Sequence, residues 1–420
     1  MKRLILLFLA FVLVNIINPA DCSAIPEFAR KYGFNCSMCH TGFTKLNDFG
    51  QRFRDNGYQI PGQQGKEKNV FESSFPLALR VPVGYSFYNT KKGTASGFNL
   101  LGFDLLTAGV LHKNVSYLVI YTPRIDIPSA SYTGPDSLNS SASQFGSLES
   151  VSLVFSNIIQ DALNIRIGRF EPAYHIFSSK RSYYLMQPYE IYSFTTPSNN
   201  FSFDDNQIGI EASGHFRSGF KYAAGFLNGN GGNPDNNNYK DIYLTVLQTF
   251  GKGDGQSAGQ RLGLFGYYGW QPLTLPGSVT SPAGNTNGSD NNPFYRIGAT
   301  GSFNWQSFNV EMMYMKGVDN SSFNTLEPAE KYSFNGGFVE LDYAGMVNNR
   351  LIASGIFNWI EPPSYDSMRE VRAYSFLLRY YLAHWTAVNI SLHAEYTHRI
   401  SGKEEKLTEN IFLLGLDFAL

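Results

Sequence analysis

The sequence predicts an all-β fold: a transmembrane β-barrel of the outer-membrane type, with about sixteen antiparallel strands and a small segment before them. Three observations predict it. Short runs of alternating apolar and polar residues recur from about residue 76 to residue 420, separated by Gly, Asn, Ser and Pro. The connections between these runs alternate between short and long. Beyond the first 24 residues, no eighteen consecutive residues are apolar, so membrane helices are not predicted.

The alternation is clearest near the C-terminus. In 409–420, Phe412, Leu414, Leu416 and Phe418 share one face, because successive side chains of a strand point to opposite sides. In an outer-membrane barrel the apolar face contacts lipid and the polar face lines the lumen. The expected strands are 76–89, 97–111, 115–126, 147–158, 163–172, 205–216, 219–229, 239–250, 260–272, 293–305, 308–318, 332–344, 350–361, 370–382, 387–399 and 409–420.

Connection lengths distinguish this barrel from a soluble β-sandwich. Tight turns are expected at 112–114, 217–218, 306–307 and 383–386. Long connections rich in Ser, Asn, Gly and Pro lie between them, at 127–146, 173–204, 273–292 and 319–331. Short periplasmic turns alternate with long extracellular loops in such barrels, whereas a sandwich has no reason to segregate its loops. We therefore expect the long connections on the extracellular side and a lumen wide enough for water.

The N-terminus reads as a secretory signal peptide. Lys2-Arg3 is followed by an apolar run over 4–17 and by the small-residue cleavage site Cys22-Ser23-Ala24. The mature chain would begin near Ile25 and keep two cysteines. The expected organisation is a signal peptide at 1–24, an N-terminal segment at 25–75 with one helix over 44–56, and a barrel at 76–420 in the outer membrane. The net charge of −1 argues against nucleic-acid binding.

The pentapeptide Cys36-Ser37-Met38-Cys39-His40 matches the attachment site of a c-type haem. Cys36 and Cys39 can each bond one haem vinyl group, and His40 then becomes the proximal ligand of the iron. A zinc site would need a second Cys/His pair, and Cys22 is the only other cysteine. A thioredoxin-like redox site would need a βαβ context that the flanking sequence lacks. We therefore expect one covalent haem c.

A segment of about fifty residues is too small to enclose a haem alone, so we expect it to sit in or against the barrel mouth as a plug. It also carries a resemblance. Four short motifs resemble the amino-terminal signature of the fused monohaem cytochrome c–porin family, whose best-known members are outer-membrane iron oxidases. These are Ile25-Pro26-Glu27-Phe28-Ala29-Arg30-Lys31-Tyr32-Gly33, Cys36-Ser37-Met38-Cys39-His40-Thr41, Leu46-Asn47-Asp48-Phe49-Gly50 and Asn56-Gly57-Tyr58.

The resemblance implies a function: one haem inside an outer-membrane barrel takes electrons from extracellular Fe(II) and passes them to a periplasmic c-type cytochrome or another carrier. The protein would then be an iron oxidase, an Fe(II):cytochrome c oxidoreductase. Two alternatives stay open. One is a diffusion porin with a haem-containing gate, and the other is a conduit for other extracellular electron donors or acceptors.

The sixth ligand of the haem iron must come from outside the N-terminal segment, where His40 is the only histidine and Met38 lies within the attachment loop. By strand parity, His393 and His215 point into the lumen, and they are the first candidates for a distal ligand. Met186 and His175, in the connection 173–204, come next.

Charged residues on the expected inward faces have two interpretations. They could offer oxygen ligands to Fe²⁺, or they could hydrate the lumen and pair across it to hold a plug. The pair Lys180-Arg181 is expected to be solvated. The inward charges are Arg166, Glu211, Asp241, Glu311, Glu395, Arg399 and Asp417.

Overall fold

The computed structural model describes residues 28, 31–34, 36–66, 68–70, 72, 76–123, 147–174, 176–199, 201–251, 259–272, 291–347, 349–384 and 388–419. The expected signal peptide at 1–24, the connection 127–146 and most of 273–292 lie outside these residues. Among the described residues, no helix is both long and apolar enough to cross a membrane.

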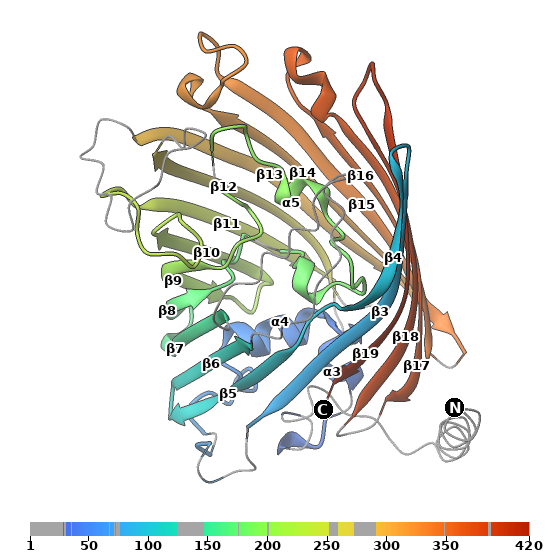
Figure 1. The fold of residues 1–420 in the computed structure, drawn as a ribbon. Coiled ribbons are helices and arrows are strands. Elements are labelled where there is room, and N and C mark those ends of the chain that lie inside the picture. Colours follow the sequence, from blue (N-terminus) through green and yellow to red (C-terminus); the bar gives the residue numbers. More distant parts are fainter. Residues whose placement is uncertain are drawn as a thin grey trace.

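In the described part of the chain, the strands close into one antiparallel barrel (Figure 1). The first and last strands pair with each other, with Leu414 opposite Tyr85. The strands are β3 (Ala78–Thr90), β4 (Gly93–Leu100), β5 (Asp104–His112), β6 (Val115–Thr122), β7 (Ser147–Asp161), β8 (Leu163–Phe170), β9 (Gln207–His215), β10 (Phe220–Leu227), β11 (Asp241–Phe250), β12 (Gln260–Pro272), β13 (Asn291–Trp305), β14 (Phe308–Asp319), β15 (Tyr332–Met346), β16 (Leu351–Glu361), β17 (Val371–His384), β18 (Asn389–Ser401) and β19 (Leu407–Ala419).

The predicted sixteen-strand barrel is confirmed, because β4 and β5 are two parts of one strand that both pair with β3. The expected strand 97–111 differs in detail: it begins earlier, at Gly93, and is interrupted at 101–103. The interruption lies beside Pro82 of β3, whose carbonyl oxygen accepts a hydrogen bond from the backbone of Leu101 at 2.9 Å. Proline has no N–H to return to the ladder, so the regular pairing ends there.

The exterior of the barrel is apolar, as strand parity predicts. Leu264, Ile297 and Phe376 point outward and are more than half exposed. On β18 the alternation is sharp, since Leu392 is 44% exposed and the next residue, His393, is 2% exposed. An exterior of this kind is stable when it contacts lipid.

The connection between β8 and β9, residues 171–206, enters the lumen; we call it the inner segment. It contains η1 (Ser179–Arg181) and α5 (Glu190–Ser193), and it is the green chain inside the barrel in Figure 1. Tyr189 and Tyr192 are almost fully buried, and the Tyr189 ring stacks on Phe338 of β15 with centroids 4.0 Å apart. The connection 173–204 was expected on the long-loop side of the barrel, with the possibility that it folds inward, and the structure shows that it does fold inward. Its aromatic side chains pack against inward-facing strand residues, so they fill much of the lumen that was expected to hold water.

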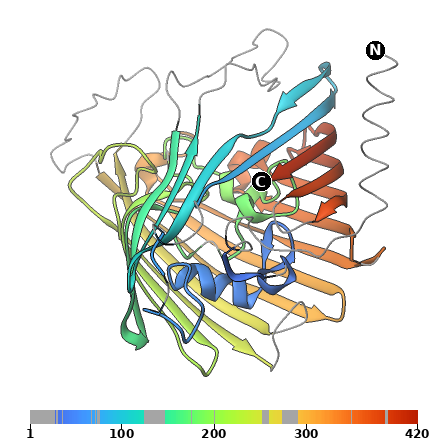
Figure 2. The ribbon, with the colours of Figure 1, turned by 90° about the horizontal axis from the view of Figure 1, so that it is seen from below.

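The N-terminal segment lies inside the opposite end of the barrel, near the short turns. Figure 2 views this end from below and shows the blue helices within the ring of strands. The segment contains α3 (Cys36–Cys39), β1 (His40–Gly42), β2 (Lys45–Leu46) and α4 (Asp48–Asp55). The expected helix 44–56 is thus shorter, because residues 45 and 46 belong to the small β1–β2 sheet.

Candidate functional site

The Cys-x-x-Cys-His motif occupies α3 and the start of β1. Cys39 and His40 are both buried, and the His40 ring lies against Phe43 with centroids 5.5 Å apart. Burial raises the pKa of the Cys39 thiol to about 12, unlike the exposed, acidic thiols of redox Cys-x-x-Cys sites. The side chain of Cys36 lies outside the described part of the structure.

Asn47 holds this motif against the helix that follows it. Its side-chain oxygen accepts the Gly50 N–H at 2.9 Å and so caps the start of α4. Its side-chain amide donates to the Met38 carbonyl at 3.0 Å, and its backbone N–H donates to the Cys39 carbonyl at 2.9 Å. At Gly50 a Cβ atom would lie 2.1 Å from the Cys39 carbonyl oxygen, so only glycine allows this approach. The motif Leu46-Asn47-Asp48-Phe49-Gly50 therefore positions the residues around His40.

The end of α4 explains the motif Asn56-Gly57-Tyr58. The Tyr58 N–H donates to the Phe53 carbonyl at 2.8 Å and the Gly57 N–H to the Arg54 carbonyl at 3.1 Å, which together form a Schellman motif. Gly57 has a φ of +68°, where a side chain is unfavourable. This turn brings Tyr58 back onto Phe28, whose ring stacks on it at 5.1 Å.

A cavity of about 220 Å³ lies between the N-terminal segment, the barrel wall and the inner segment. Cys39 and His40 form part of its wall. Its apolar lining includes Phe53, Tyr58 and, from the barrel, Leu118. Such a pocket, apolar over most of its wall with a few polar groups, is typical of a cofactor site.

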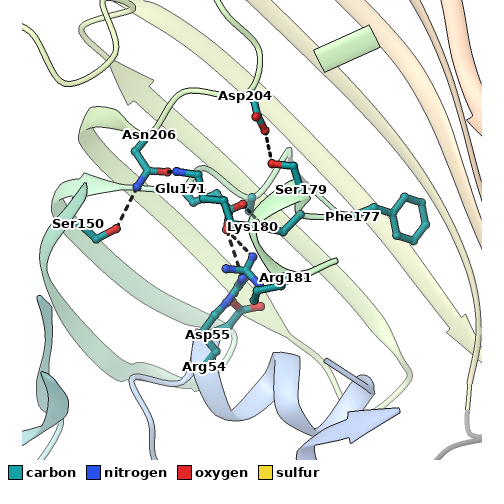
Figure 3. Close-up of polar contacts among 12 residues, drawn as sticks. Arg54, Asp55, Ser150, Glu171, Phe177, Ser179, Lys180, Arg181, Asp204 and Asn206 are labelled. Carbon is teal, nitrogen blue, oxygen red and sulfur yellow. Dashed lines mark hydrogen bonds and ion pairs between the residues drawn. The ribbon is translucent and has the colours of Figure 1, made fainter. Parts of the chain in front are cut away.

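Charged residues form another part of the cavity wall (Figure 3). Arg54 of α4 and Arg181 of η1 both approach Glu171: Arg181 donates a hydrogen bond to it, and Arg54 Nη1 lies 3.8 Å from its Oε2. Arg54 also pairs with Asp55 at 2.9 Å. Arg166 of β8 lies 3.7 Å from Asp55. Three guanidinium groups from three separate elements thus meet at one side of the cavity.

Two ion-pair clusters fix the N-terminal segment to the barrel. Lys45 Nζ contacts Glu311, Glu340 and Asp342 at 2.9, 3.1 and 2.5 Å, and all four side chains are buried. Burial alone would lower the pKa of Lys45, but these carboxylates hold it well above its usual range. The second cluster is centred on Asp55.

Asp55 pairs with Lys221 and accepts a hydrogen bond at 3.0 Å from His215 Nε2. Burial alone would raise its pKa, but the cations Lys221 and Arg54 hold the pKa well below its usual range. Both clusters join the segment to strands at the short-turn end.

Three of the candidate distal ligands, His215, His393 and Met186, lie in the described part of the chain but are not among the residues that line the cavity. His215 faces Asp55, and His393 Nε2 lies 3.1 Å from Ser391 Oγ. The backbone N–H of Met186 donates to Glu395 at 3.2 Å, and His175 is outside the described residues. Of the described residues that line the cavity, only His40 is a histidine and none is a methionine. A sixth ligand from His215 or His393 stays a prediction.

In the part of the chain that the structure describes, the inward charges have polar partners, but only Arg166 and Glu211 among them pair with each other, at 3.4 Å. Arg399 pairs with Glu190 of the inner segment at 3.2 Å, and Glu395 accepts the backbone N–H of Leu185 at 2.7 Å. Within the described residues, no group of three or more His, Cys, Asp and Glu side chains is arranged to hold a metal ion.

The expectation that Lys180-Arg181 is solvated is wrong. Arg181 pairs with Glu171, and Lys180 pairs with Glu149 at 2.9 Å. The many aromatic residues of 173–204 indicate that this connection is buried, because a solvated loop has no need of them.

No protein-family model matches this chain, and no curated protein matches it. Solved structures of outer-membrane proteins do match its fold. The anion-selective porin from Comamonas acidovorans has a TM-score of 0.54 and 12% identity, over 82% of this chain and 98% of that one. Salmonella typhi OmpF in complex with daunomycin has 0.53 and 11%, over 82% and 97%. The outer membrane channel DcaP of Acinetobacter baumannii has 0.52 and 8%, over 82% and 96%.

At these identities the similarity concerns the fold. The closed barrel, its apolar exterior and these neighbours define a β-barrel of the porin type, and its place is the outer membrane.

Proposed function

We propose that this protein is an outer-membrane cytochrome–porin that carries electrons across the outer membrane. The observation that carries the proposal is that Cys39 and His40 of the Cys-x-x-Cys-His motif line a cavity inside a porin-type barrel. Cys36 and Cys39 would bond one haem c, and His40 would be its proximal ligand.

The residues around the cavity suit this cofactor. Aromatic and aliphatic side chains, among them Phe28, Phe53 and Leu118, can cover an apolar ring, and Arg54, Arg166 and Arg181 offer cations to its carboxylates. When bound, the haem supplies a one-electron couple whose potential is tuned by burial and nearby charge. The chain contributes a buried His40 and the helix cap at Asn47 that positions the motif.

The two segments that fill the lumen favour electron transfer over a diffusion porin with a haem-containing gate. The inner segment and the N-terminal segment place packed side chains where a diffusion porin needs an open, water-filled passage. Electron transfer, in contrast, benefits from close packing between donor and acceptor.

The substrate and partner are proposed from the resemblance and the topology. The donor would be extracellular Fe(II), oxidised at the cell surface so that insoluble ferric products stay outside. The acceptor would be a periplasmic c-type cytochrome. The N-terminal segment that carries His40 contacts the barrel near the short turns, through Lys45 with Glu311 and Asp55 with Lys221. This end faces the periplasm in outer-membrane barrels, so a periplasmic carrier can approach the segment. The proposed reaction is Fe(II):cytochrome c oxidoreduction.

The test has two stages. Haem staining of a denaturing gel should label the wild-type chain, and the double variant Cys36→Ser, Cys39→Ser should lose the band. A band that persists in the double variant would sink the haem assignment.

Fe²⁺ added to the oxidised, purified protein should then reduce the haem, and His40→Ala should abolish this response. If the haem is attached but Fe²⁺ does not reduce it at any pH where the ion is soluble, the iron-oxidase part is wrong. A conduit for other donors or acceptors then takes its place.

A further inference from the structure

Three arginines that are distant in the sequence converge on the cavity. Arg54, Arg166 and Arg181 come from α4, β8 and η1, and their side chains are 17%, 11% and 28% exposed. Figure 3 shows Arg54 and Arg181 approaching Glu171 from two different elements. No local sequence signal places these residues together, and the helix cap and tight turns described above do not require them.

The carboxylates around these arginines are shared. Glu171 serves both Arg54 and Arg181, and Asp55 serves Arg54, Arg166 and Lys221. Glu211 lies 3.4 Å from Arg166. Four cations, counting Lys221, therefore face three carboxylates, Asp55, Glu171 and Glu211. Buried charge of one sign is costly unless it is paired, so this group of side chains favours a further anion.

The remaining charges of the cavity wall are matched separately. Arg80 shares Asp417 with Arg379 of β17, at 3.0 and 2.9 Å, and Lys180 pairs with Glu149 at 2.9 Å. Asp104 accepts a hydrogen bond from Thr122 at 2.8 Å. The cluster of Arg54, Arg166 and Arg181 is therefore the part of the cavity wall where three guanidinium groups meet.

We infer that Arg54, Arg166 and Arg181 bind the propionate groups of the haem. This inference rests on the proposed function and deepens it, because it names the residues that recognise the polar edge of the cofactor. The planar guanidinium group suits two-pronged binding of a carboxylate, and Glu171 already shows Arg54 and Arg181 converging on one. The arginines also connect three structural units, so haem binding would hold the N-terminal segment, the barrel and the inner segment together.

A cation beside the haem favours the reduced form, which carries one positive charge less than the oxidised form. Removing the cation should therefore lower the midpoint potential. It should also move the propionate titration to higher pH, because a carboxylate loses its acidity when a neighbouring cation is lost.

The experiment uses the full-length holoprotein in detergent and compares Arg54→Gln and Arg181→Gln with Arg399→Gln. Arg399 is a matched control: its side chain is also 28% exposed and ion-paired, but it does not line the cavity. Haem staining checks attachment, and spectroelectrochemical titration between pH 5 and pH 9 measures the midpoint potential. Arg181→Lys keeps the positive charge, so it distinguishes an effect of charge on the midpoint potential from a structural disturbance at this position.

We expect stained haem in every variant. Arg54→Gln and Arg181→Gln should lower the potential and shift its pH dependence upward, while Arg399→Gln should match the wild type and Arg181→Lys should recover most of the shift. Potentials of Arg54→Gln and Arg181→Gln that equal the control would overturn the inference and leave the proposed function intact. A wild-type chain without stained haem would overturn both.

Discussion

At the scale of single residues, a few polar side chains do most of the positioning around the haem motif. Asn47 binds the carbonyl oxygens of Met38 and Cys39 and also caps α4, so one residue joins the motif to the helix. Because Gly50 lies directly against Cys39, this junction has no space for a shift of the helix. Asn47 and Gly50 therefore act mainly by holding the haem motif in a fixed position against α4.

Replacing Asn47 with alanine removes this cap. We expect Asn47→Ala to destabilise α4 by about 1 kcal/mol, the usual cost of a lost N-cap, which corresponds to roughly fivefold faster exchange of its amide hydrogens. Hydrogen exchange followed by mass spectrometry would measure the change. Asn69→Ala is the control, because Asn69 makes the same kind of contact with the Glu72 N–H away from the motif. Equal effects of the two changes on α4 would contradict the assignment.

Asp55 should make the docking of the N-terminal segment depend on pH. Its pKa is lower in the folded protein than the value near 3.9 of an unfolded chain, so its stabilising effect is complete above about pH 4 to 5 and is lost as the pH falls towards the folded value. Asp55→Asn should therefore weaken docking at pH 7 and resemble the wild type in strong acid. Protease protection of the segment would be measured for both chains from pH 7 to pH 2. A difference between Asp55→Asn and the wild type that stays constant over this range would mean that another group is responsible.

At the scale of elements, the strands could be predicted from the sequence and the inner segment could not. Lipid forces each strand to alternate, and a pattern such as Leu392 outside and His393 inside is local enough to read. The path of 171–206 depends on contacts with distant strands, for example Tyr189 with Glu340 and Phe338. The haem motif could be recognised in the same way, because its five residues are adjacent in the sequence. The convergence of Arg54, Arg166 and Arg181, in contrast, exists only in the folded chain.

Lys45 should be the main attachment of the N-terminal segment to β14 and β15. Lys45→Met would leave the carboxylates of Glu311, Glu340 and Asp342 without their shared cation, which costs roughly 3–5 kcal/mol for a buried ion pair. We expect the segment to be cleaved much faster by an added protease while the barrel keeps its resistance. Lys240→Met, which removes a half-exposed pair with Asp235, should have little effect. Unchanged cleavage in Lys45→Met would mean that the Asp55 cluster alone suffices.

At the scale of the whole molecule, the two segments that fill the lumen differ in chemistry. The inner segment packs aromatic side chains around the middle of the barrel, and the N-terminal segment places the haem motif near the short turns. The proposed direction of electron flow therefore depends on how the barrel is oriented in the outer membrane.

Cysteine labelling on intact cells would determine this orientation. Glu327 lies in the long connection before β15, and Lys113 lies in the tight turn between β5 and β6; both are exposed. Because long loops face outward in such barrels, Glu327→Cys should react with a membrane-impermeant thiol reagent on whole cells. Lys113→Cys should react only after the outer membrane is permeabilised, and the wild-type chain gives the background. The opposite pattern would place the haem motif at the cell surface, and the donor and acceptor sides of the proposed reaction would then exchange.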